Sequence, residues 1–125
     1  MIRTFCKGKI HRAVVTQARL DYPGSITICR DLMRAADILP YEMVHINSTA
    51  NAVHWETYAI PGAKGTVCLN GCPARLFQPG DIVIILSLGQ YADHELEGLY
   101  AKVVRVDAAN EIVNVENHEI ARELK

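Results

Sequence analysis

The residues with the clearest capacity for chemistry are Gly24 and Ser25, which stand together in the segment Asp21–Ile28. A serine hydroxyl is a poor nucleophile unless a neighbouring group activates and aims it. A glycine before it lets the backbone adopt a strained conformation, which exposes the glycine carbonyl to attack. By itself a Gly-Ser pair predicts only a bend, so its chemistry depends on the rest of the chain.

Cysteines and histidines raise the question of a metal site. The spacing Cys68-x3-Cys72 places two thiols close together, with His11, His45 and His54 as candidate co-ligands. A structural zinc site usually has two closely spaced pairs of ligands, and the second pair is missing here. The 4 cysteines of the chain are also too few for a disulfide scaffold. We therefore expect no metal and, instead, buried thiols that stay reduced.

The composition is that of one globular domain. The chain has 125 residues, 50% of them hydrophobic, which is enough for a single core. Its formal net charge is -1. This balance gives no reason to expect binding to nucleic acid or to a membrane surface. Charged and apolar residues interleave at the N-terminus, so no signal peptide is predicted, and no apolar run approaches the roughly 18 residues of a membrane span. These features predict a cytoplasmic protein with one domain over residues 1–125.

Short segments rich in β-branched residues are expected to position Gly24, Ser25 and the other candidate site residues. Apolar patterns predict strands at residues 10–18, 25–28, 43–47, 54–60 and 81–86, and a hairpin of residues 100–106 and 112–116. One helix is predicted over residues 31–39, where Pro40 ends it, and a short one over the tail 117–125. Many short strands with few helices favour an all-β fold, a small closed barrel whose topology the pattern alone does not choose.

Four segments around the Gly-Ser pair carry a resemblance to a known family. They are Lys9–Arg12, Val15–Ala18, Glu56–Ile60 and Leu69–Gly71, and the match is nearly continuous over residues 1–91. Together they resemble the pyruvoyl-dependent aspartate 1-decarboxylases. The resemblance implies a six-stranded double-psi β-barrel that assembles as a homotetramer, with active sites between neighbouring subunits.

The resemblance also implies that the chain makes its own cofactor. In this family the bond between Gly24 and Ser25 breaks, which gives a β chain of residues 1–24 and an α chain of residues 25–125 that begins with a pyruvoyl group derived from Ser25. The ketone forms a Schiff base with a small amino-acid substrate and withdraws electrons, so the α-carboxylate leaves as carbon dioxide. The implied reaction converts L-aspartate to β-alanine, a precursor of pantothenate and coenzyme A.

The resemblance assigns separate tasks to the site residues. Thr57 and Asn70 match family residues that lie beside the Gly24 carbonyl and support cleavage, and Tyr58 matches the proposed proton donor. Lys9 would hold a substrate carboxylate by charge-assisted hydrogen bonds. The implied substrate-binding residues are Lys9, His54, Thr57, Asn70, Gly71 and Cys72.

Departures from the family pattern cluster around the implied substrate site. His54 stands where the family usually has an arginine, and an imidazole cannot reproduce the bidentate fork of that side chain. The loop 61–67 is shorter than usual, and Cys72-Pro73 replaces alanines, with loss of a backbone donor at the proline. Two alternatives therefore stay open: a decarboxylase of a different small amino acid, and a non-catalytic barrel paralogue. The sequence also leaves open whether cleavage is autonomous or assisted by a maturation partner.

Overall fold

The computed structural model describes residues 1–121, and β-strands make up most of them. The strands are β1 (Ile2–Val14), β2 (Gln17–Arg19), β3 (Ser25–Cys29), β4 (Met43–Ser48), β5 (His54–Gly62), β6 (Val67–Asn70), β7 (Ile82–Ala92), β8 (Tyr100–Val106) and β9 (Ile112–Glu119). The helical elements are short: α1 (Arg30–Ala35) and the 3-10 helices η1 (Cys72–Arg75) and η2 (Asp93–Glu95). The predicted all-β fold is confirmed. No helix within the described residues is long and apolar enough to cross a membrane.

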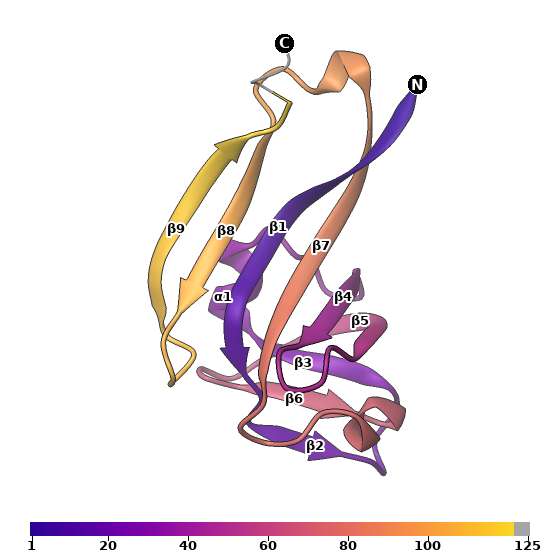
Figure 1. The fold of residues 1–125 in the computed structure, drawn as a ribbon, viewed down its shortest axis with the longest axis vertical. Coiled ribbons are helices and arrows are strands. Elements are labelled where there is room, and N and C mark those ends of the chain that lie inside the picture. The colour runs from indigo at the N-terminus through magenta and orange to yellow at the C-terminus, as the bar shows by residue number, and fades with distance from the viewer. Residues whose placement is uncertain (122–125) are drawn as a thin grey trace.

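The sheet closes into a barrel because the first strand serves both of its edges. The hydrogen-bonded order is β2-β6-β3-β5-β4-β7-β1, with β8 and β9 beyond β1 (Figure 1). Only Val15 and Thr16 separate β1 from β2, and their amides donate to the carbonyls of Asp81 and Val67. β1 and β2 thus form one continuous strand that pairs with β7 on one side and with β6 on the other. With β3 to β7 this makes the six strands of the double-psi β-barrel.

Strand alternation sends one side of each barrel strand into the interior. On β3 the inward residues are Ile26 and Ile28, and on β4 they are Val44 and Ile46, all fully buried. The largest fully buried side chains are Phe77, Ile10, Ile26, Ile28, Leu32, Ile46, Leu69, Ile85, Val15, Val44, Val67 and Val83. The other side of β3 carries Ser25 and Thr27, which belong to the candidate site.

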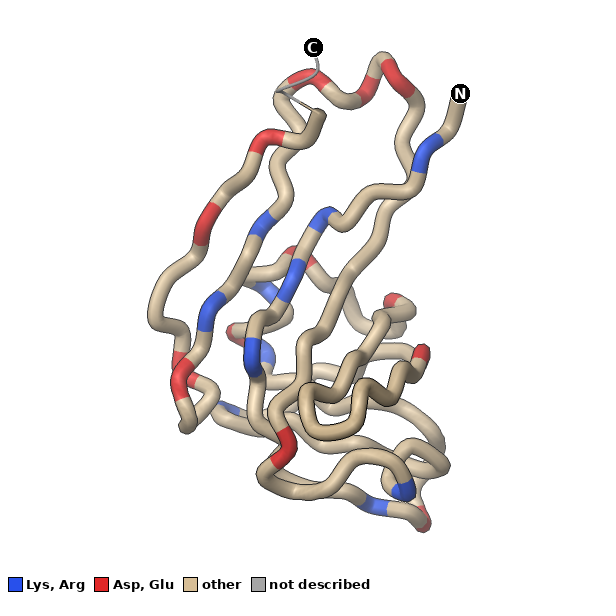
Figure 2. The backbone as a smooth tube through the Cα atoms, in the orientation of Figure 1, with Lys and Arg blue, Asp and Glu red and all other residues tan. Residues whose placement is uncertain are grey.

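β1 and β7 continue beyond the barrel and form an arm with β8 and β9 (Figure 1). β8 pairs in parallel with β1 and antiparallel with β9. Lysine and arginine follow β1 and β8, whereas Asp and Glu lie on β9 and at the far end of the arm (Figure 2). Arg105 on β8 pairs with Glu116 on β9 at 2.6 Å, and this hydrogen bond lowers the pKa of the Glu116 carboxyl. The arm therefore carries a cross-strand ion pair between β8 and β9.

The alternation predicted over residues 10–18 is wrong after Ile10. Arg12 has a φ of 67°, and the register between β1 and β7 shifts between Ile10 and Ala13. This bulge inserts an extra residue and reverses the side that each later residue faces. Ile10, Ala13 and Val15 are consequently all buried, whereas the pattern had placed Ile10 and Val15 on opposite sides.

The helix and the tail also differ from the prediction. α1 ends at Ala35, well before Pro40, because the chain turns at Asp37, which has a φ of 58°. Residues 117–119 belong to β9, so the predicted terminal helix is wrong as far as residue 121, and residues 122–125 lie outside the described part. The sequence pattern also missed β6, whose four residues are too few for a periodic signal.

Candidate active site

Ser25 begins β3, and its hydroxyl lies in a buried polar cluster shared with β6. In this antiparallel pair Ser25 is opposite Asn70, and Thr27 is opposite Cys68. Residues two apart share a face of the sheet, so these four side chains lie together. The Asn70 amide donates from Nδ2 to Ser25 Oγ and to Thr27 Oγ1, each at 3.0 Å. The structure thus joins Asn70 to the Ser25 hydroxyl in the uncleaved chain.

Cys68 fixes the orientation of the Asn70 amide. Its Sγ donates to Asn70 Oδ1 at 3.3 Å, which leaves the amide nitrogen facing the two hydroxyls. Burial raises the pKa of the Cys68 thiol, and the charge of Arg19 opposes this only in part. The sulfur therefore stays protonated and remains a donor. The sequence indicated only a buried thiol here and gave no role to Thr27; the period of two along β3 and β6 is the signal that finds both.

The Ser25 hydroxyl is aimed by neutral partners. It donates to the Pro23 carbonyl at 3.2 Å and accepts from Asn70. Among residues 1–121, no carboxylate, imidazole or amine lies within hydrogen-bonding distance of it. The arrangement orients the oxygen without removing its proton, so attack on the adjacent carbonyl depends on geometry more than on a strong base.

Gly71 packs directly against the backbone of Gly24. Its φ is 77°, and a Cβ at this position would lie 2.7 Å from Gly24 Cα, 2.9 Å from Gly24 N and 3.0 Å from the Tyr22 carbonyl oxygen. Only glycine accommodates both this conformation and this approach. The Gly71 amide donates to the Arg19 carbonyl at 2.8 Å, so the fold itself uses this donor.

Arg19 also holds the turn that precedes Ser25. Its guanidinium lies 4.8 Å from the centre of the Tyr22 ring and donates to the Tyr22 hydroxyl at 2.7 Å. The Arg19 carbonyl accepts from the amides of both Tyr22 and Gly71. One residue therefore ties the turn between β2 and β3 to the end of β6.

β5 places Tyr58 beside Ser25. β3 and β5 are parallel with Ile26 opposite Ala59, so one position back along both strands are Ser25 and Tyr58. Since Ile26 and Ala59 are fully buried, Ser25 and Tyr58 share the outer side of the sheet. The Tyr58 ring stacks on Tyr41, with 5.1 Å between centroids and 6° between planes. This stack restricts the orientation of the phenol.

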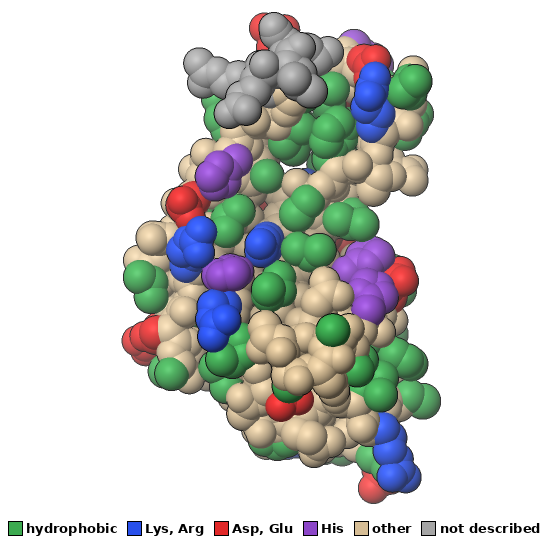
Figure 3. Space-filling view, in the orientation of Figure 1, with side chains coloured by type: hydrophobic (Ala, Val, Ile, Leu, Met, Phe, Trp, Pro, Cys, Tyr) green, Lys and Arg blue, Asp and Glu red, His purple; other side chains and the backbone are tan. Residues whose placement is uncertain are grey.

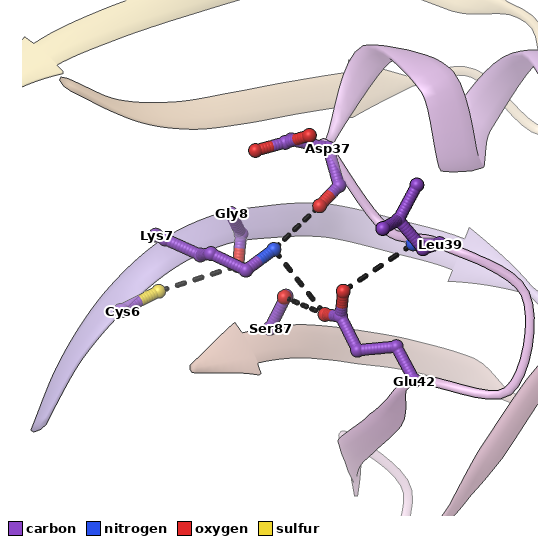
Figure 4. A network of polar contacts seen from close by, with 7 residues as sticks. All are labelled: Cys6, Lys7, Gly8, Asp37, Leu39, Glu42 and Ser87. Carbon is purple, nitrogen blue, oxygen red and sulfur yellow. Dashed lines mark hydrogen bonds and ion pairs between the residues drawn. The ribbon is translucent and has the colours of Figure 1, made fainter. Parts of the chain in front are cut away.

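A polar network anchors the loop that carries Tyr41 (Figure 4). The Glu42 carboxylate accepts from the buried Ser87 hydroxyl of β7 and pairs with Lys7 of β1 at 3.2 Å. Lys7 also donates to the Asp37 carbonyl. The side chains of Lys7 and Glu42 are only 15% and 22% exposed, so solvent screens this pair less than an ordinary surface ion pair. The network fixes the loop, and with it Tyr41, to the two longest strands.

The structure does not bring every predicted residue to Ser25. Thr57 is buried on the opposite face of β5 from Tyr58, and within residues 1–121 no hydrogen bond joins it to Gly24 or Ser25. Lys9 is half-buried on β1 and has neither a hydrogen bond nor an ion pair from its side chain in the described part of the chain. Cys72 is exposed at the start of η1, where the missing amide hydrogen of Pro73 is not needed.

The hairpin of β4 and β5 holds His54 in place. Nδ1 of its ring lies 2.8 Å from Asn47 Oδ1, and Nε2 lies 3.3 Å from Glu56 Oε2. His45 faces the same carboxylate, with Nε2 3.6 Å from Glu56 Oε1. Both nitrogens of His54 are thus engaged within the chain, and the candidate metal ligands His45 and His54 group with Glu56 rather than with the cysteines.

Known proteins are similar to this chain over almost its whole length. The aspartate decarboxylase family model matches residues 1–113. The aspartate 1-decarboxylase of Moorella thermoacetica is 50% identical over 121 residues, which cover 95% of this chain and 94% of the relative. That of Acetivibrio thermocellus is 49% identical over 121 residues, covering 95% and 96%, and that of Neisseria meningitidis is 50% identical over 121 residues, covering 95% of each. With half of its residues shared across almost its whole length, this chain belongs to the aspartate decarboxylase family.

Proposed function

We propose that this chain is a self-processing, pyruvoyl-dependent carboxy-lyase that converts L-aspartate to β-alanine and carbon dioxide. The observation that carries the proposal is the position of Ser25, whose hydroxyl is oriented by Asn70 while Gly71 packs against the preceding Gly24. The relatives that match the chain over almost its full length are named aspartate 1-decarboxylases. The aspartate substrate is the one that their name gives.

Maturation starts from Ser25 itself. Its Oγ attacks the Gly24 carbonyl carbon, the bond between that carbon and the Ser25 nitrogen breaks, and an ester with a free Ser25 amine results. Loss of the Ser25 α-proton then breaks the bond between Cβ and the ester oxygen, which releases residues 1–24 with a carboxylate and leaves dehydroalanine. Hydrolysis removes its nitrogen as ammonia and leaves the pyruvoyl group.

Asn70 supports this reaction as a hydrogen-bond donor. Its Nδ2 donates to the attacking Ser25 Oγ at 3.0 Å, and we assign it the same role toward the negative charge that develops on the Gly24 carbonyl oxygen. One donor to such an oxyanion contributes about 3–4 kcal/mol to transition-state stabilisation. We assign a second supporting role to Thr57, on the strand next to β3. The neutral surroundings of Ser25 fit a slow, single maturation event.

The pyruvoyl group supplies an electron sink that accepts the electron pair left when the substrate carboxylate departs as carbon dioxide. Tyr58, one position back from the Ile26–Ala59 pair and stacked on Tyr41, returns a proton to the substrate carbon. Lys9 binds a substrate carboxylate, for which its ammonium has no competing partner in the described part of the chain. The backbone of Gly71 and Cys72 bounds the pocket.

We also propose the homotetramer, in which a neighbouring copy completes each site. Large apolar side chains are exposed on both sides of the Ser25 region: Leu20 and Tyr22 before it, and Leu39, Tyr41 and Met43 near Tyr58. Exposed apolar patches of this kind mark interfaces between proteins. A cytoplasmic location stays a prediction, and whether cleavage is autonomous or assisted by a maturation partner stays open.

A second candidate is decarboxylation of another small amino acid. The observation in its favour is the state of His54, whose two ring nitrogens face Asn47 and Glu56. The carboxylate of Glu56 disfavours a second carboxylate at this position, such as that of an aspartate side chain. An amino acid with a neutral side chain avoids this repulsion.

Mass spectrometry and an activity assay test the proposal together. Purified protein is expected to consist of residues 1–24 and a pyruvoyl-capped 25–125, and to form β-alanine from L-aspartate. Ser25→Ala is expected to remain uncleaved and inactive, whereas Ser48→Ala, at a buried serine outside the site, should cleave normally. An intact chain after prolonged warming would instead indicate a non-catalytic paralogue, and a cleaved chain that turns over only other amino acids would indicate the second candidate.

A further inference from the structure

We propose that the β4–β5 hairpin carries a divalent-metal site of the zinc type, formed by His45, His54 and Glu56. In the antiparallel register His45 is opposite Glu56, and Asn47 is opposite His54. Residues two apart share a face, so all four side chains project from the outer side of the hairpin. Figure 3 shows histidine side chains beside an acidic one over this part of the molecule. The inference goes beyond the proposed decarboxylation and does not rest on it.

The spacing of the ligand atoms suits tetrahedral zinc. His54 Nε2 lies 3.3 Å from Glu56 Oε2, and His45 Nε2 lies 3.6 Å from Glu56 Oε1. Zinc bonds of about 2.0–2.2 Å to histidine and carboxylate place neighbouring ligand atoms about 3.3–3.6 Å apart. The three ligand atoms all lie within 4.8 Å of one another, so small side-chain rotations bring them to one ion. Water would fill the fourth position.

The hydrogen bonding of His54 prepares it for a cation. Asn47 Oδ1 can only accept, so Nδ1 of His54 carries the proton that it donates across 2.8 Å. In the neutral ring Nε2 then has a lone pair on the side of the Glu56 carboxylate, where a metal ion would be shared by both groups. A metal-binding histidine commonly has its second nitrogen fixed in this way by a hydrogen bond.

No permanent cation neutralises Glu56. Its ion-pair partners within residues 1–121 are His45 and His54, and neither a lysine nor an arginine is among them. The two imidazole rings lie 5.2 Å apart and are inclined by 40°, so both can present Nε2 to one ion. Zinc binds both imidazole and carboxylate, and imidazole also suits copper, iron and nickel. The side chains are 26%, 47% and 53% exposed in the order His45, His54 and Glu56, which gives an ion access from solvent.

Calorimetric titration with zinc chloride tests the site directly. Full-length protein dialysed against EDTA is expected to bind one zinc ion per chain, and His45→Ala and Glu56→Gln are expected to abolish this binding. Asn47→Ala should weaken it about 10–100-fold, since it removes only the bond that orients His54. His118→Ala is the matched control, because His118 also faces a glutamate, Glu116, at 3.9 Å, but within residues 1–121 no third ligand joins them.

Cobalt substitution identifies the ligand type. The exposed thiols of Cys6 and Cys72 are the main competing ligands. The hairpin site is supported if the protein forms a cobalt complex that shows no thiolate charge-transfer absorption. This complex should be lost in His45→Ala and should still form in Cys72→Ser. Unchanged zinc affinity in both His45→Ala and Glu56→Gln, or no binding by the unaltered protein at micromolar zinc, overturns the proposal. Each variant lies on the surface, and its thermal unfolding confirms that it is folded. These readouts do not use decarboxylation, so they stay valid whether or not the chain decarboxylates.

Discussion

Replacing Gly71 with alanine tests whether close packing holds the segment before Ser25. The new Cβ would lie 2.7 Å from Gly24 Cα, with the Tyr22 carbonyl oxygen at 3.0 Å. A left-handed conformation costs a residue with a side chain about 1–2 kcal/mol. The overlap adds about 1–3 kcal/mol, because the atoms it meets are backbone and cannot rotate away. We therefore expect the free energy of unfolding to fall by about 2–5 kcal/mol.

Gly98→Ala supplies a matched control for the backbone cost. Gly98 has a φ of 75°, close to the 77° of Gly71, and nothing lies within 4 Å of a Cβ at position 98. This variant should lose only about 1–2 kcal/mol, so the difference between the two variants isolates the contact with Gly24.

Two assays read the effect. Urea unfolding at one protein concentration, in a Ser25→Ala background that keeps every chain uncleaved, compares the stabilities. Mass spectrometry over time, with Ser25 present, measures the rate of cleavage. In Gly71→Ala the segment before Ser25 is displaced, which raises the activation free energy of cleavage. We expect cleavage to be about tenfold slower for each 1.4 kcal/mol of this increase. Gly98→Ala should cleave at the normal rate. If Gly71→Ala loses no more stability than Gly98→Ala and cleaves as fast as the unaltered chain, the packing argument is refuted.

Three further predictions concern proton transfer, pH and carboxylate binding. Tyr58→Phe should leave cleavage intact and lower kcat about 10²–10⁴-fold, whereas Thr57→Val should slow cleavage itself. Mass spectra measure cleavage, and β-alanine formation measures decarboxylation. If either variant affects cleavage and decarboxylation equally, the roles assigned to Tyr58 and Thr57 are contradicted. Burial and neighbouring cations lower the pKa of His11 in the folded protein. The unfolded state therefore binds more protons, and the free energy of unfolding falls as the pH drops below about 6.5. His11→Gln should reduce this loss of stability, measured by urea unfolding between pH 7 and pH 5. His54→Arg should raise kcat/KM for L-aspartate about 10–100-fold, and the double variant with Glu56→Gln should raise it more, because the competing carboxylate is removed. If kcat/KM changes in neither the single nor the double variant, position 54 does not bind substrate.

Local pattern was sufficient for the strands with strong β-branched runs. The segments at 25–28, 43–47 and 54–60 form β3, β4 and β5 almost as expected, because β-branched and aromatic residues favour strands. The bulge at Arg12 escaped prediction because a positive φ in a non-glycine residue depends on tertiary contacts. The same holds for the early end of α1.

The site was predictable by residue but not by contact. The resemblance identified Ser25 and Asn70, yet their hydrogen bond joins positions 45 residues apart and depends on the register of β3 against β6. That register also adds Cys68 and Thr27, which no local motif marks. The histidines were first grouped with the cysteines, and only the pairing of β4 with β5 shows that Glu56 is their partner.

Strand geometry separates the making of the cofactor from the choice of substrate. Ser25 and Asn70 lie on β3 and β6, whereas Tyr58, Glu56 and His54 follow one another at every second position on the outer face of β5. At about 3.3 Å per residue, Glu56 is roughly 7 Å along the strand from Tyr58, within the Debye length of about 8 Å at physiological salt. A change of charge at the hairpin therefore lies closer to Tyr58, on the same strand, than to the Ser25–Asn70 cluster, which lies on β3 and β6. Divergence at position 54 can thus alter turnover while cleavage persists, and in this chain His54 departs from the family pattern whereas Gly24-Ser25 and Glu56–Ile60 keep it.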